Sequence, residues 1–291
     1  MEIKVIGCGS AFSNVNYNQS FLLSENGETL LLDCGFRTPQ AFFHHKIDPR
    51  SIDNIYISHS HADHIGGLEF MAFSRYDWMK MPRHYEESEN SPPTLIANEE
   101  LMKELWNESL QGGLKSMEGF DAEINTFFKT KPIASNETFR WQGWKCELIQ
   151  QIHVMTGTMF MNTFGLFLSK EGHKSIYFTT DSQHCSPRQI EIFYRNANII
   201  FQDCECIGID TKKKEYKFGG MVHASYAQLA GYPSANSIQL PADIKAKMVL
   251  SHYQDFVNEK KDFYGNDCDW DKLAKDDGFL EFAKVGKIYK I

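Results

Sequence analysis

The run at positions 59–64 reads His-Ser-His-Ala-Asp-His and holds four side chains that can bind metal ions. It follows the segment 52–58, in which Ile55 and Ile57 alternate with polar neighbours, a pattern that predicts a half-buried strand. A helix is predicted directly after the run, at 65–73. Imidazole is a good ligand for zinc and related ions, whereas carboxylate suits harder ions. A polar turn that is merely rich in histidine would leave this spacing unexplained, so we expect a site for two adjacent divalent ions at the end of a strand.

Further ligands should follow later strands, and three polar residues fit that description. His153 follows the apolar stretch 146–152, Asp181 follows 175–180, and His252 follows 247–251. A single histidine at a strand end is more often a satisfied core or surface residue than a ligand. These three positions therefore need the context of the 59–64 run before they can be interpreted as ligands.

That context comes from a resemblance, because His-x-His-x-Asp-His after a strand is similar to the hallmark of the metallo-β-lactamase superfamily. The segments 5–12, 18–23 and 30–35 resemble the opening hairpins of its ribonuclease Z-like branch. The resemblance covers nearly the whole chain. It implies an α/β fold, the metallo-β-lactamase αββα sandwich, formed as a single domain over residues 1–291, with a loop and helix insertion at 75–135.

The resemblance also implies a ligand set for two divalent metal ions. Zn²⁺ is the expected ion, with Mn²⁺ as the alternative. One ion would take His59, His61 and His153, the other would take Asp63, His64 and His252, and Asp181 would bridge them. Two ions that share a bridging water would lower its pKa towards neutrality and supply hydroxide at pH 7. Asp63 is also expected to be a catalytic residue. Asp33 has two possible roles: it either forms hydrogen bonds that orient the ligand histidines or is a turn residue.

A second constellation separates branches of the superfamily. Asp203 ends the predicted strand 198–203, and His223 follows later in the chain. This pair resembles the ribonuclease Z-like arrangement, in which a carboxylate orients a histidine that is not a ligand and that protonates the leaving oxygen. An alkoxide that leaves phosphate is a poor leaving group, so such an acid helps phosphodiester cleavage. Glu205 is an alternative partner for His223, and His223 could instead be an ordinary residue before a helix at 226–230.

Composition and length set further limits. The chain has 291 residues, 42% of them hydrophobic, which suffices for a large core. Seven cysteines without paired spacing argue against a disulfide framework. No leader or membrane-length apolar run is apparent, so we expect a cytoplasmic protein without a membrane partner, in the host cytoplasm if a phage encodes it. The insertion should contain a loop at 79–94 and a helix at 97–110, and relatives of this branch suggest a homodimer.

Two observations bear on the substrate. Ribonuclease Z enzymes that clamp transfer RNA carry a long basic arm, in most members between the positions matched here by His153 and Asp181, and this interval holds only a strand and a turn. The formal net charge of −8 also disfavours a polyanion, although a basic cluster lies at 212–217. The chain therefore looks most like the armless cyclic nucleotide phosphodiesterases of the phage anti-Pycsar type, which destroy cyclic nucleotide immune signals.

We thus expect a dinuclear phosphodiesterase that hydrolyses small nucleotide phosphodiesters, most of all cyclic mononucleotides, through a metal-bridging hydroxide and His223 as general acid. Tyr226, Tyr253 or Phe256 could stack the base or could simply pack in the core. The alternatives are a transfer RNA 3′-processing endonuclease, a thioester or lactam hydrolase, and a non-catalytic binding protein of the same fold. RNA is a possible partner, but the sequence disfavours it.

Overall fold

The computed structural model describes residues 1–80, 92–183, 186–219, 222–235 and 239–291. The chain forms two compact units. Unit 1 comprises residues 1–7, 17–137 and 286–291, and unit 2 comprises residues 8–16 and 138–285. Each unit contains one large sheet together with its own helices.

Unit 1 is built on a seven-stranded sheet in the order β20-β1-β2-β3-β4-β5-β8. The strands β20, β1, β2 and β3 pair antiparallel, whereas β3, β4, β5 and β8 pair parallel. The apolar run at 30–32 is buried, as expected for a strand that is covered on both faces. The strand bounds are β1 Glu2–Gly7, β2 Ser20–Glu25, β3 Glu28–Leu32, β4 Asn54–Tyr56, β5 Thr94–Asn98, β8 Lys129–Ile133 and β20 Ile288–Lys290.

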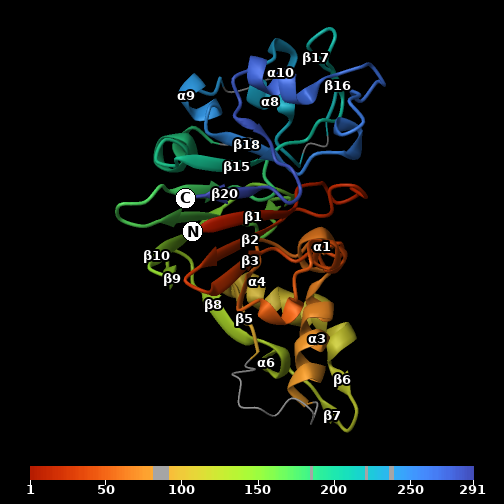
Figure 1. Ribbon diagram of the computed structural model, residues 1–291, viewed down its shortest axis with the longest axis vertical. Helices are drawn as coiled ribbons and strands as arrows, with labels where there is room; N and C mark the ends of the chain where they lie inside the picture. Colours follow the sequence, from red (N-terminus) through yellow and green to blue (C-terminus); the bar gives the residue numbers. More distant parts are fainter. Residues whose placement is uncertain (81–91, 184–185, 220–221, 236–238) are drawn as a thin grey trace. The chain divides into compact units, whose positions relative to one another are not determined.

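The helices of unit 1 pack on this sheet and bury one hydrophobic cluster (Figure 1). Helix α1 (Thr38–His45) ends where Lys46 takes a left-handed conformation, and Gly66 and Gly67 separate α2 (Ala62–Ile65) from α3 (Leu68–Lys80). The Asn98 side chain caps α4 by accepting a hydrogen bond from the Glu100 amide. The remaining elements are η1 Pro49–Ser51, α4 Glu99–Glu104, η3 Leu105–Leu110, α5 Gln111–Leu114, α6 Ile124–Phe127, and the hairpin of β6 Ser116–Met117 with β7 Phe120–Asp121.

The segment 75–135 contains more regular structure than the loop and helix expected from sequence. The predicted helix at 97–110 is present as α4 followed by the π-helical turn η3, and it continues into α5. The segment also supplies β5 and β8, two strands of the large sheet that were not anticipated. Most of the predicted loop at 79–94, residues 81–91, lies outside the described residues.

Unit 2 is built on a second seven-stranded sheet in the order β19-β18-β15-β14-β13-β10-β9. Here β9, β10, β13 and β14 pair antiparallel, and β14, β15, β18 and β19 pair parallel. The predicted strands all appear, within a few residues of their expected bounds. The sheet also contains β9 and β19, which were not predicted. The strand bounds are β9 Thr138–Trp141, β10 Trp144–Gln150, β13 Phe164–Ser169, β14 Ile176–Phe178, β15 Ile199–Asp203, β18 Met248–Ser251 and β19 Glu281–Phe282.

Short helices and hairpins complete unit 2, and α8, α9 and α10 lie on the same side of β15 and β18 (Figure 1). Tyr226 on α8 packs against Trp270 and Phe282, and Tyr253 also packs against Phe282. The elements are β11 Met155–Thr156, β12 Met159–Phe160, α7 Pro187–Gln189, η4 Ile190–Tyr194, β16 Ile209–Asp210, β17 Glu215–Tyr216, α8 Tyr226–Ala230, η5 Pro233–Ala235, α9 Ala242–Lys245, η6 Asp255–Val257 and α10 Trp270–Asp276.

In the described ranges, none of the helices combines the length and the apolar character that crossing a membrane requires.

Both large sheets carry polar residues just after their parallel strands. Asp33 and His59 follow β3 and β4 in unit 1, and Asp181 and His252 follow β14 and β18 in unit 2. In sheets of this kind, ligands bind outside the carboxyl ends of the strands.

Candidate metal and catalytic centre

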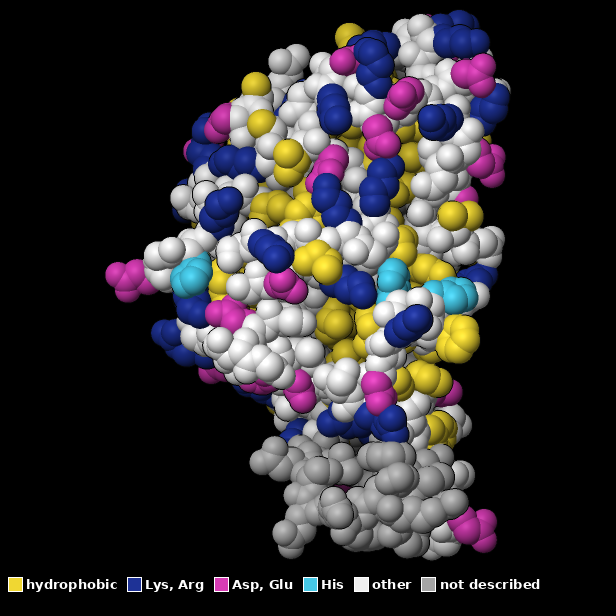
Figure 2. Space-filling model, in the orientation of Figure 1, with side chains coloured by type: hydrophobic (Ala, Val, Ile, Leu, Met, Phe, Trp, Pro, Cys, Tyr) yellow, Lys and Arg dark blue, Asp and Glu magenta, His cyan; other side chains and the backbone are white. Residues whose placement is uncertain are grey.

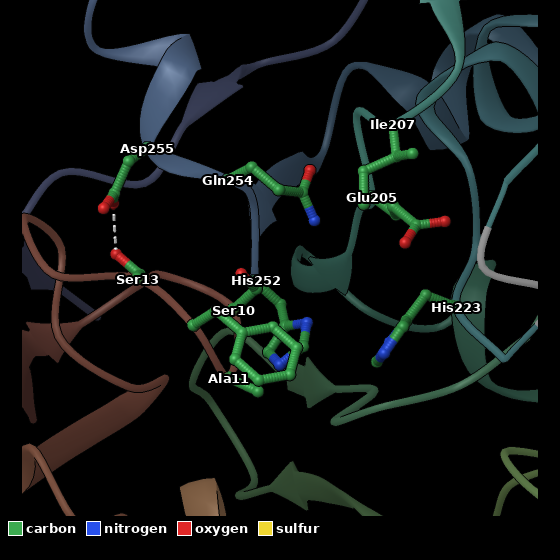
Figure 3. Close-up of a pocket in the computed structure, with 10 residues that line it drawn as sticks. Ser10, Ala11, Ser13, Glu205, Ile207, His223, His252, Gln254 and Asp255 are labelled. Atoms are coloured by element: carbon green, nitrogen blue, oxygen red, sulfur yellow. Dashed lines mark hydrogen bonds between the residues drawn. The ribbon is translucent and has the colours of Figure 1, made fainter. Parts of the chain in front are cut away.

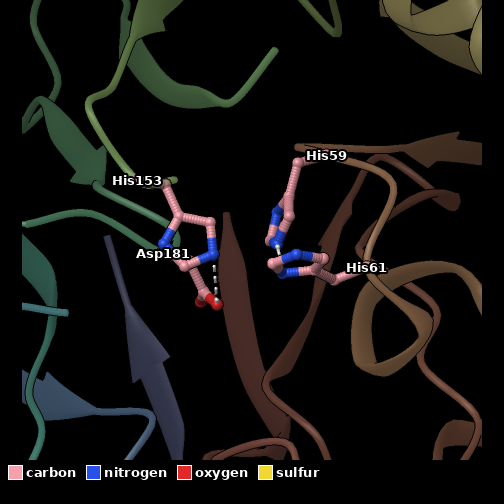
Figure 4. A group of neighbouring side chains, drawn as sticks. All are labelled: His59, His61, His153 and Asp181. Atoms are coloured by element: carbon pink, nitrogen blue, oxygen red, sulfur yellow. Dashed lines mark hydrogen bonds and ion pairs between the residues drawn. The ribbon is translucent and has the colours of Figure 1, made fainter. Parts of the chain in front are cut away.

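The four ligand-type side chains of the 59–64 run lie together in unit 1, in the turn between β4 and α2. Nε2 of His59 is 3.2 Å from Nδ1 of His61, and the His59 and His64 rings are 4.1 Å apart. Figure 4 shows His59 and His61 converging from this turn. Nε2 of His64 is 3.3 Å from an oxygen of Asp63, and His59, Asp63 and His64 are all buried. The run therefore forms a compact set of ligand atoms within its own unit.

Asp33 holds two of these histidines in one tautomer. Nδ1–H of His64 donates to Oδ2 of Asp33 at 2.8 Å, and the Ser58 hydroxyl donates to the same oxygen, also at 2.8 Å. Since Ser58 Oγ gives its proton to Asp33, it accepts one from Nδ1 of His59, 3.0 Å away. Both rings therefore keep the lone pair on Nε2, the atom that a metal ion would bind. Asp33 also has a positive φ of 59°, so both roles considered for it, support and turn residue, are present.

Gly35 lets the turn after β3 approach the turn that carries the ligands. A Cβ placed at this position would lie 1.9 Å from the carbonyl oxygen of Asp63 and 2.7 Å from Cβ of Asn18. Real side chains do not approach this closely, so one backbone segment would have to move. Only glycine fits here, and the position of Asp63 depends on it.

We expect Gly35→Ala to lower the free energy of unfolding by roughly 1–3 kcal/mol, because the added methyl group displaces backbone in a packed region. Gly112→Ala is the matched control, since nothing lies within 4 Å of its Cβ position in α5 and alanine favours a helix by roughly 0.5–1 kcal/mol. Urea denaturation of the two variants measures the effect. Equal stability of Gly35→Ala and the parent chain would contradict the close approach.

Asp181 is the centre of a second set of side chains in unit 2. Its carboxylate oxygens lie 3.7 Å from Nε2 of His153, 3.4 Å from Nε2 of His252 and 3.9 Å from Nδ1 of His223. Figure 4 shows the His153 ring directed at this carboxylate. Ligand atoms of Asp181, Asp203, His223 and His252 all lie within 4.8 Å of one another. His153 and His252, which are 99 residues apart in the sequence, thus contact the same carboxylate.

The donor atoms of His153 suit a metal ion. Its Nδ1–H donates to the backbone carbonyl of Val222 at 2.7 Å, which leaves the lone pair on Nε2, the atom that faces Asp181. Burial lowers the pKa of His153, so the ring is neutral near pH 7. A neutral imidazole lone pair beside a carboxylate oxygen is an unfavourable contact without a cation, and neutral imidazole is the form that binds metal. The chemistry of this set therefore fits a divalent ion.

Asp203 contacts two histidines from one buried position. Its Oδ2 accepts hydrogen bonds from Nδ1–H of His223 at 2.9 Å and from the Ser182 amide at 2.8 Å. Its Oδ1 lies 3.5 Å from Nδ1 of His252, and the His223 and His252 rings stack at 4.6 Å. Of the two carboxylates considered for His223, Asp203 is therefore the one in contact with it.

The charges around His223 determine its protonation. Burial alone would lower the pKa of His223, but the carboxylates of Asp203 and Asp181 outweigh that effect and raise it. Burial likewise acts to raise the pKa of Asp203, and His223 more than compensates, so the pKa of this carboxyl is lowered. The pair thus favours an imidazolium held against a carboxylate, which is the form of histidine that can donate a proton.

A cavity of about 190 Å³ in unit 2 was not anticipated from the sequence. It opens beside His223 and His252, as Figure 3 shows, and it is also lined by residues from the 8–16 loop and from the strand ends. Of the three aromatic residues considered for stacking, Tyr226 and Tyr253 are fully buried in the core, and Phe256 is half-buried. Periodicity could not reveal the cavity, because all of its lining residues except Asp255, the first residue of η6, lie in irregular segments. The lining residues are Ser10, Ala11, Phe12, Ser13, Glu205, Ile207, His223, His252, Gln254 and Asp255.

Comparison with solved structures defines the class of protein. Over 99% of this chain and 98% of the other, the fold matches that of the metallo-beta-lactamase fold protein YhfI from Bacillus subtilis, with a TM-score of 0.64 and 18% identity. The chain therefore has the metallo-β-lactamase fold, which confirms the fold class expected from sequence.

The family follows from two closer comparisons. A family model described as anti-Pycsar protein Apyc1 matches residues 1–289, so the chain belongs to this family. Two proteins of that name are similar to it. The one from Paenibacillus harenae is 28% identical over 89% of this chain and 92% of its own length, and the one from Bacillus phage vB_BsuM-Goe3 is 29% identical over 89% and 91%. The chain is a metal-dependent hydrolase, as predicted from the 59–64 run.

Proposed function

We propose that the chain is a phosphodiesterase that hydrolyses cyclic mononucleotides. In this proposal two divalent ions, Zn²⁺ or alternatively Mn²⁺, are bound by the seven ligands that the family resemblance implied. These are His59, His61, Asp63, His64, His153, Asp181 and His252. When bound, the ions would activate a water molecule for attack on phosphorus and offset the charge of the phosphate. Asp33 and Asp203 would keep the ligand histidines in the tautomers that bind metal.

The observation that carries the proposal is the position of His223. Its Nδ1 is paired with Asp203 at 2.9 Å, its ring stacks on that of His252, and its side chain lines an open cavity. A protonated histidine at this position can deliver a proton to the ribose oxygen as the P–O bond breaks. The product would be a nucleoside monophosphate. A thioester or lactam hydrolase has no need of such an acid, so this observation favours phosphodiester cleavage.

The substrate assignment draws on the family and on charge. The name anti-Pycsar protein, borne by the relatives, and the resemblance to enzymes that destroy cyclic nucleotide signals both support a cyclic mononucleotide. Folded RNA remains the disfavoured partner. Basic and acidic side chains are interspersed on the face in Figure 2. Two lysines of the 212–217 cluster face carboxylates, Lys214 at 3.2 Å from Asp277 and Lys217 at 3.9 Å from Asp210.

A homodimer and a cytoplasmic location, within the infected cell for a phage-encoded protein, are part of the same proposal. The first is supported by the ribonuclease Z-like resemblance and the second by the relatives from Bacillus phages. Sedimentation velocity would test the dimer directly.

The function is tested by incubating metal-loaded protein with 3′,5′-cyclic mononucleotides, linear dinucleotides and precursor transfer RNA. We expect the cyclic mononucleotides to give nucleoside monophosphates with the highest kcat/KM, and His64→Ala to serve as the inactive blank. Cleavage of precursor transfer RNA with little turnover of cyclic nucleotides would favour the endonuclease instead.

A further inference from the structure

We propose that Gln183 is a positioning residue that holds the proposed metal ligand His153 in place beside Asp181. This inference deepens the proposed function and rests on its ligand set, because it adds a residue that keeps two of the ligands together. Gln183 lies two residues after Asp181 in unit 2 and is half-buried. Its side chain contacts the backbone of His153, so it would act on a bound ion through that ligand.

The two ligands follow strands that are not neighbours in the sheet. His153 follows β10 and Asp181 follows β14, and β13 lies between these two strands. Adjacent strands lie about 4.7–4.9 Å apart, so the ends of β10 and β14 are separated by roughly 9–10 Å. Nε2 of His153 is nevertheless 3.7 Å from an oxygen of Asp181. The hydrogen bonds of the sheet do not bring the ligands this close, so the segments beyond the strand ends must hold them there.

Gln183 joins these two segments through two hydrogen bonds. Its backbone amide donates to the carbonyl oxygen of Ile152 at 2.7 Å, and its side-chain Nε2–H₂ donates to the carbonyl oxygen of His153, also at 2.7 Å. The two carbonyl groups belong to the peptide units on either side of the His153 Cα. The pair of hydrogen bonds therefore fixes the backbone from which the imidazole projects.

The imidazole end of His153 is fixed separately. Its Nδ1–H donates to the carbonyl of Val222, and the Ala224 amide on the same segment donates to the carbonyl of Ser182, both at 2.7 Å. His153 is thus held at its backbone by Gln183 and at its ring by Val222. Both connections lead to the residues that directly follow Asp181, so the distance between the two ligands depends on them.

Gly165 on β13 leaves room for this arrangement. A Cβ at this position would lie 3.0 Å from Nε2 of Gln151 and 3.0 Å from the carbonyl oxygen of Thr179. Gln151 and Thr179 belong to the segments that follow β10 and β14, so these segments approach each other over the strand between them. A glycine within a strand often marks such a close approach.

The test titrates chelator-stripped protein with Co²⁺, a divalent probe ion whose visible absorption reports the geometry of its ligands, and counts bound ions by native mass spectrometry. Gln183→Leu keeps a side chain of similar size that cannot donate a hydrogen bond. We expect one of the two ions to bind this variant about 10–100-fold more weakly, the usual loss when an outer contact of a metal ligand is removed. The other ion, assigned to Asp63, His64 and His252, should keep its affinity.

Gln189→Leu is the matched control. Gln189 is another glutamine of unit 2 whose Nε2–H₂ donates to a backbone carbonyl, that of Gln150 at 3.0 Å, at the end of β10. It should bind both ions as tightly as the parent chain does, and urea denaturation of the metal-free proteins should give the two variants similar midpoints. An equal loss of Co²⁺ affinity in both variants would show a general effect on folding and would overturn the positioning role.

Turnover of cyclic mononucleotides separates this inference from the proposed function. Saturating Co²⁺ should restore kcat of Gln183→Leu, because the residue acts through the hold of His153 on the ion. If the parent chain binds two ions but hydrolyses no cyclic mononucleotide, the proposed function fails, and a weakened ion in Gln183→Leu still supports the positioning role. Turnover in the parent chain, together with equal Co²⁺ affinity and identical Co²⁺ spectra in Gln183→Leu, would overturn the positioning role alone.

Discussion

Replacing His223 by alanine should lower kcat for cyclic mononucleotides about 10²–10⁴-fold, which is the usual contribution of a positioned general acid. The ribose alkoxide leaves poorly without a proton, and the His223–Asp203 pair is the proton source in this account. The p-nitrophenolate ion needs no proton to leave. The loss should therefore be much smaller for bis(p-nitrophenyl) phosphate, and steady-state assays with both substrates on the same preparations measure the difference.

The pH profile provides a second readout for His223. Because Asp203 and Asp181 raise the pKa of His223 despite its burial, the imidazolium persists to higher pH than in an exposed histidine. Activity should fall as pH rises through that pKa, since the acid is then deprotonated. Asp203→Asn removes the nearest negative charge, so this alkaline limb should move to lower pH. Equal losses on both substrates in His223→Ala, with no change in the profile of Asp203→Asn, would rule out a general acid.

Asp181→Asn should lower kcat/KM by at least about 10³-fold and should reduce the metal content of the purified protein. The Asp181 carboxylate lies within 4 Å of the His153, His223 and His252 imidazoles, so the substitution removes a negative charge that all three rings contact. Bound divalent ions would lower the pKa of a water molecule from 15.7 to about 7, so losing them would remove the proposed nucleophile at neutral pH. Mass spectrometry of metals and steady-state kinetics measure the two effects.

Asp210→Asn is the control for this change. Asp210 is a buried aspartate of the same unit, 6% exposed, and it accepts a hydrogen bond from the Lys213 amide on the β16–β17 hairpin. We expect its metal content and kcat/KM to stay within about twofold of the parent chain, because Asp210 does not belong to the clusters of ligand-type side chains around Asp181. A similar loss in both variants would indicate a general effect on folding in place of a metal ligand.

The candidate ligands His153, Asp181 and His252 were found from sequence because each follows a strand, and the family resemblance then grouped them with the 59–64 run. In the structure Asp181 and His252 follow two strands of one parallel set and lie 3.4 Å apart. The 59–64 run needed no tertiary information at all, since its four side chains lie close in sequence. The strands at 164–169 and 248–251 were similarly apparent from apolar runs.

The remaining features depend on tertiary contacts that leave no local pattern. The second contact of Asp203, with His252 at 3.5 Å, arises because β15 and β18 are neighbours in the sheet. Gln254 is fixed by the amide of Cys206, 48 residues away, and Phe12 depends on Asp255 for the conformation of its loop. The strands β5 and β8 were missed because their neighbours in sequence are helical and polar, so the segment 75–135 lacked an alternating pattern.

The two units repeat one arrangement. In unit 1, Asp33 supports His64 directly and His59 through Ser58, and in unit 2, Asp203 contacts both His223 and His252. In each case a buried carboxylate after a strand holds imidazoles through Nδ1 and leaves Nε2 for another task. A contact between a carboxylate and Nδ1 of a ligand histidine fixes the tautomer of that histidine. Such contacts commonly contribute 10–100-fold to metal affinity.

In the proposed function, this chain binds two divalent ions and needs them for phosphodiester hydrolysis. Chelator-stripped protein titrated with Zn²⁺, or with Mn²⁺, and followed by native mass spectrometry and cyclic nucleotide turnover tests it most directly. We predict two ions per chain, with activity that appears as they bind, and fewer ions in Asp181→Asn. Full turnover of cyclic nucleotides by protein that carries no metal would contradict the account.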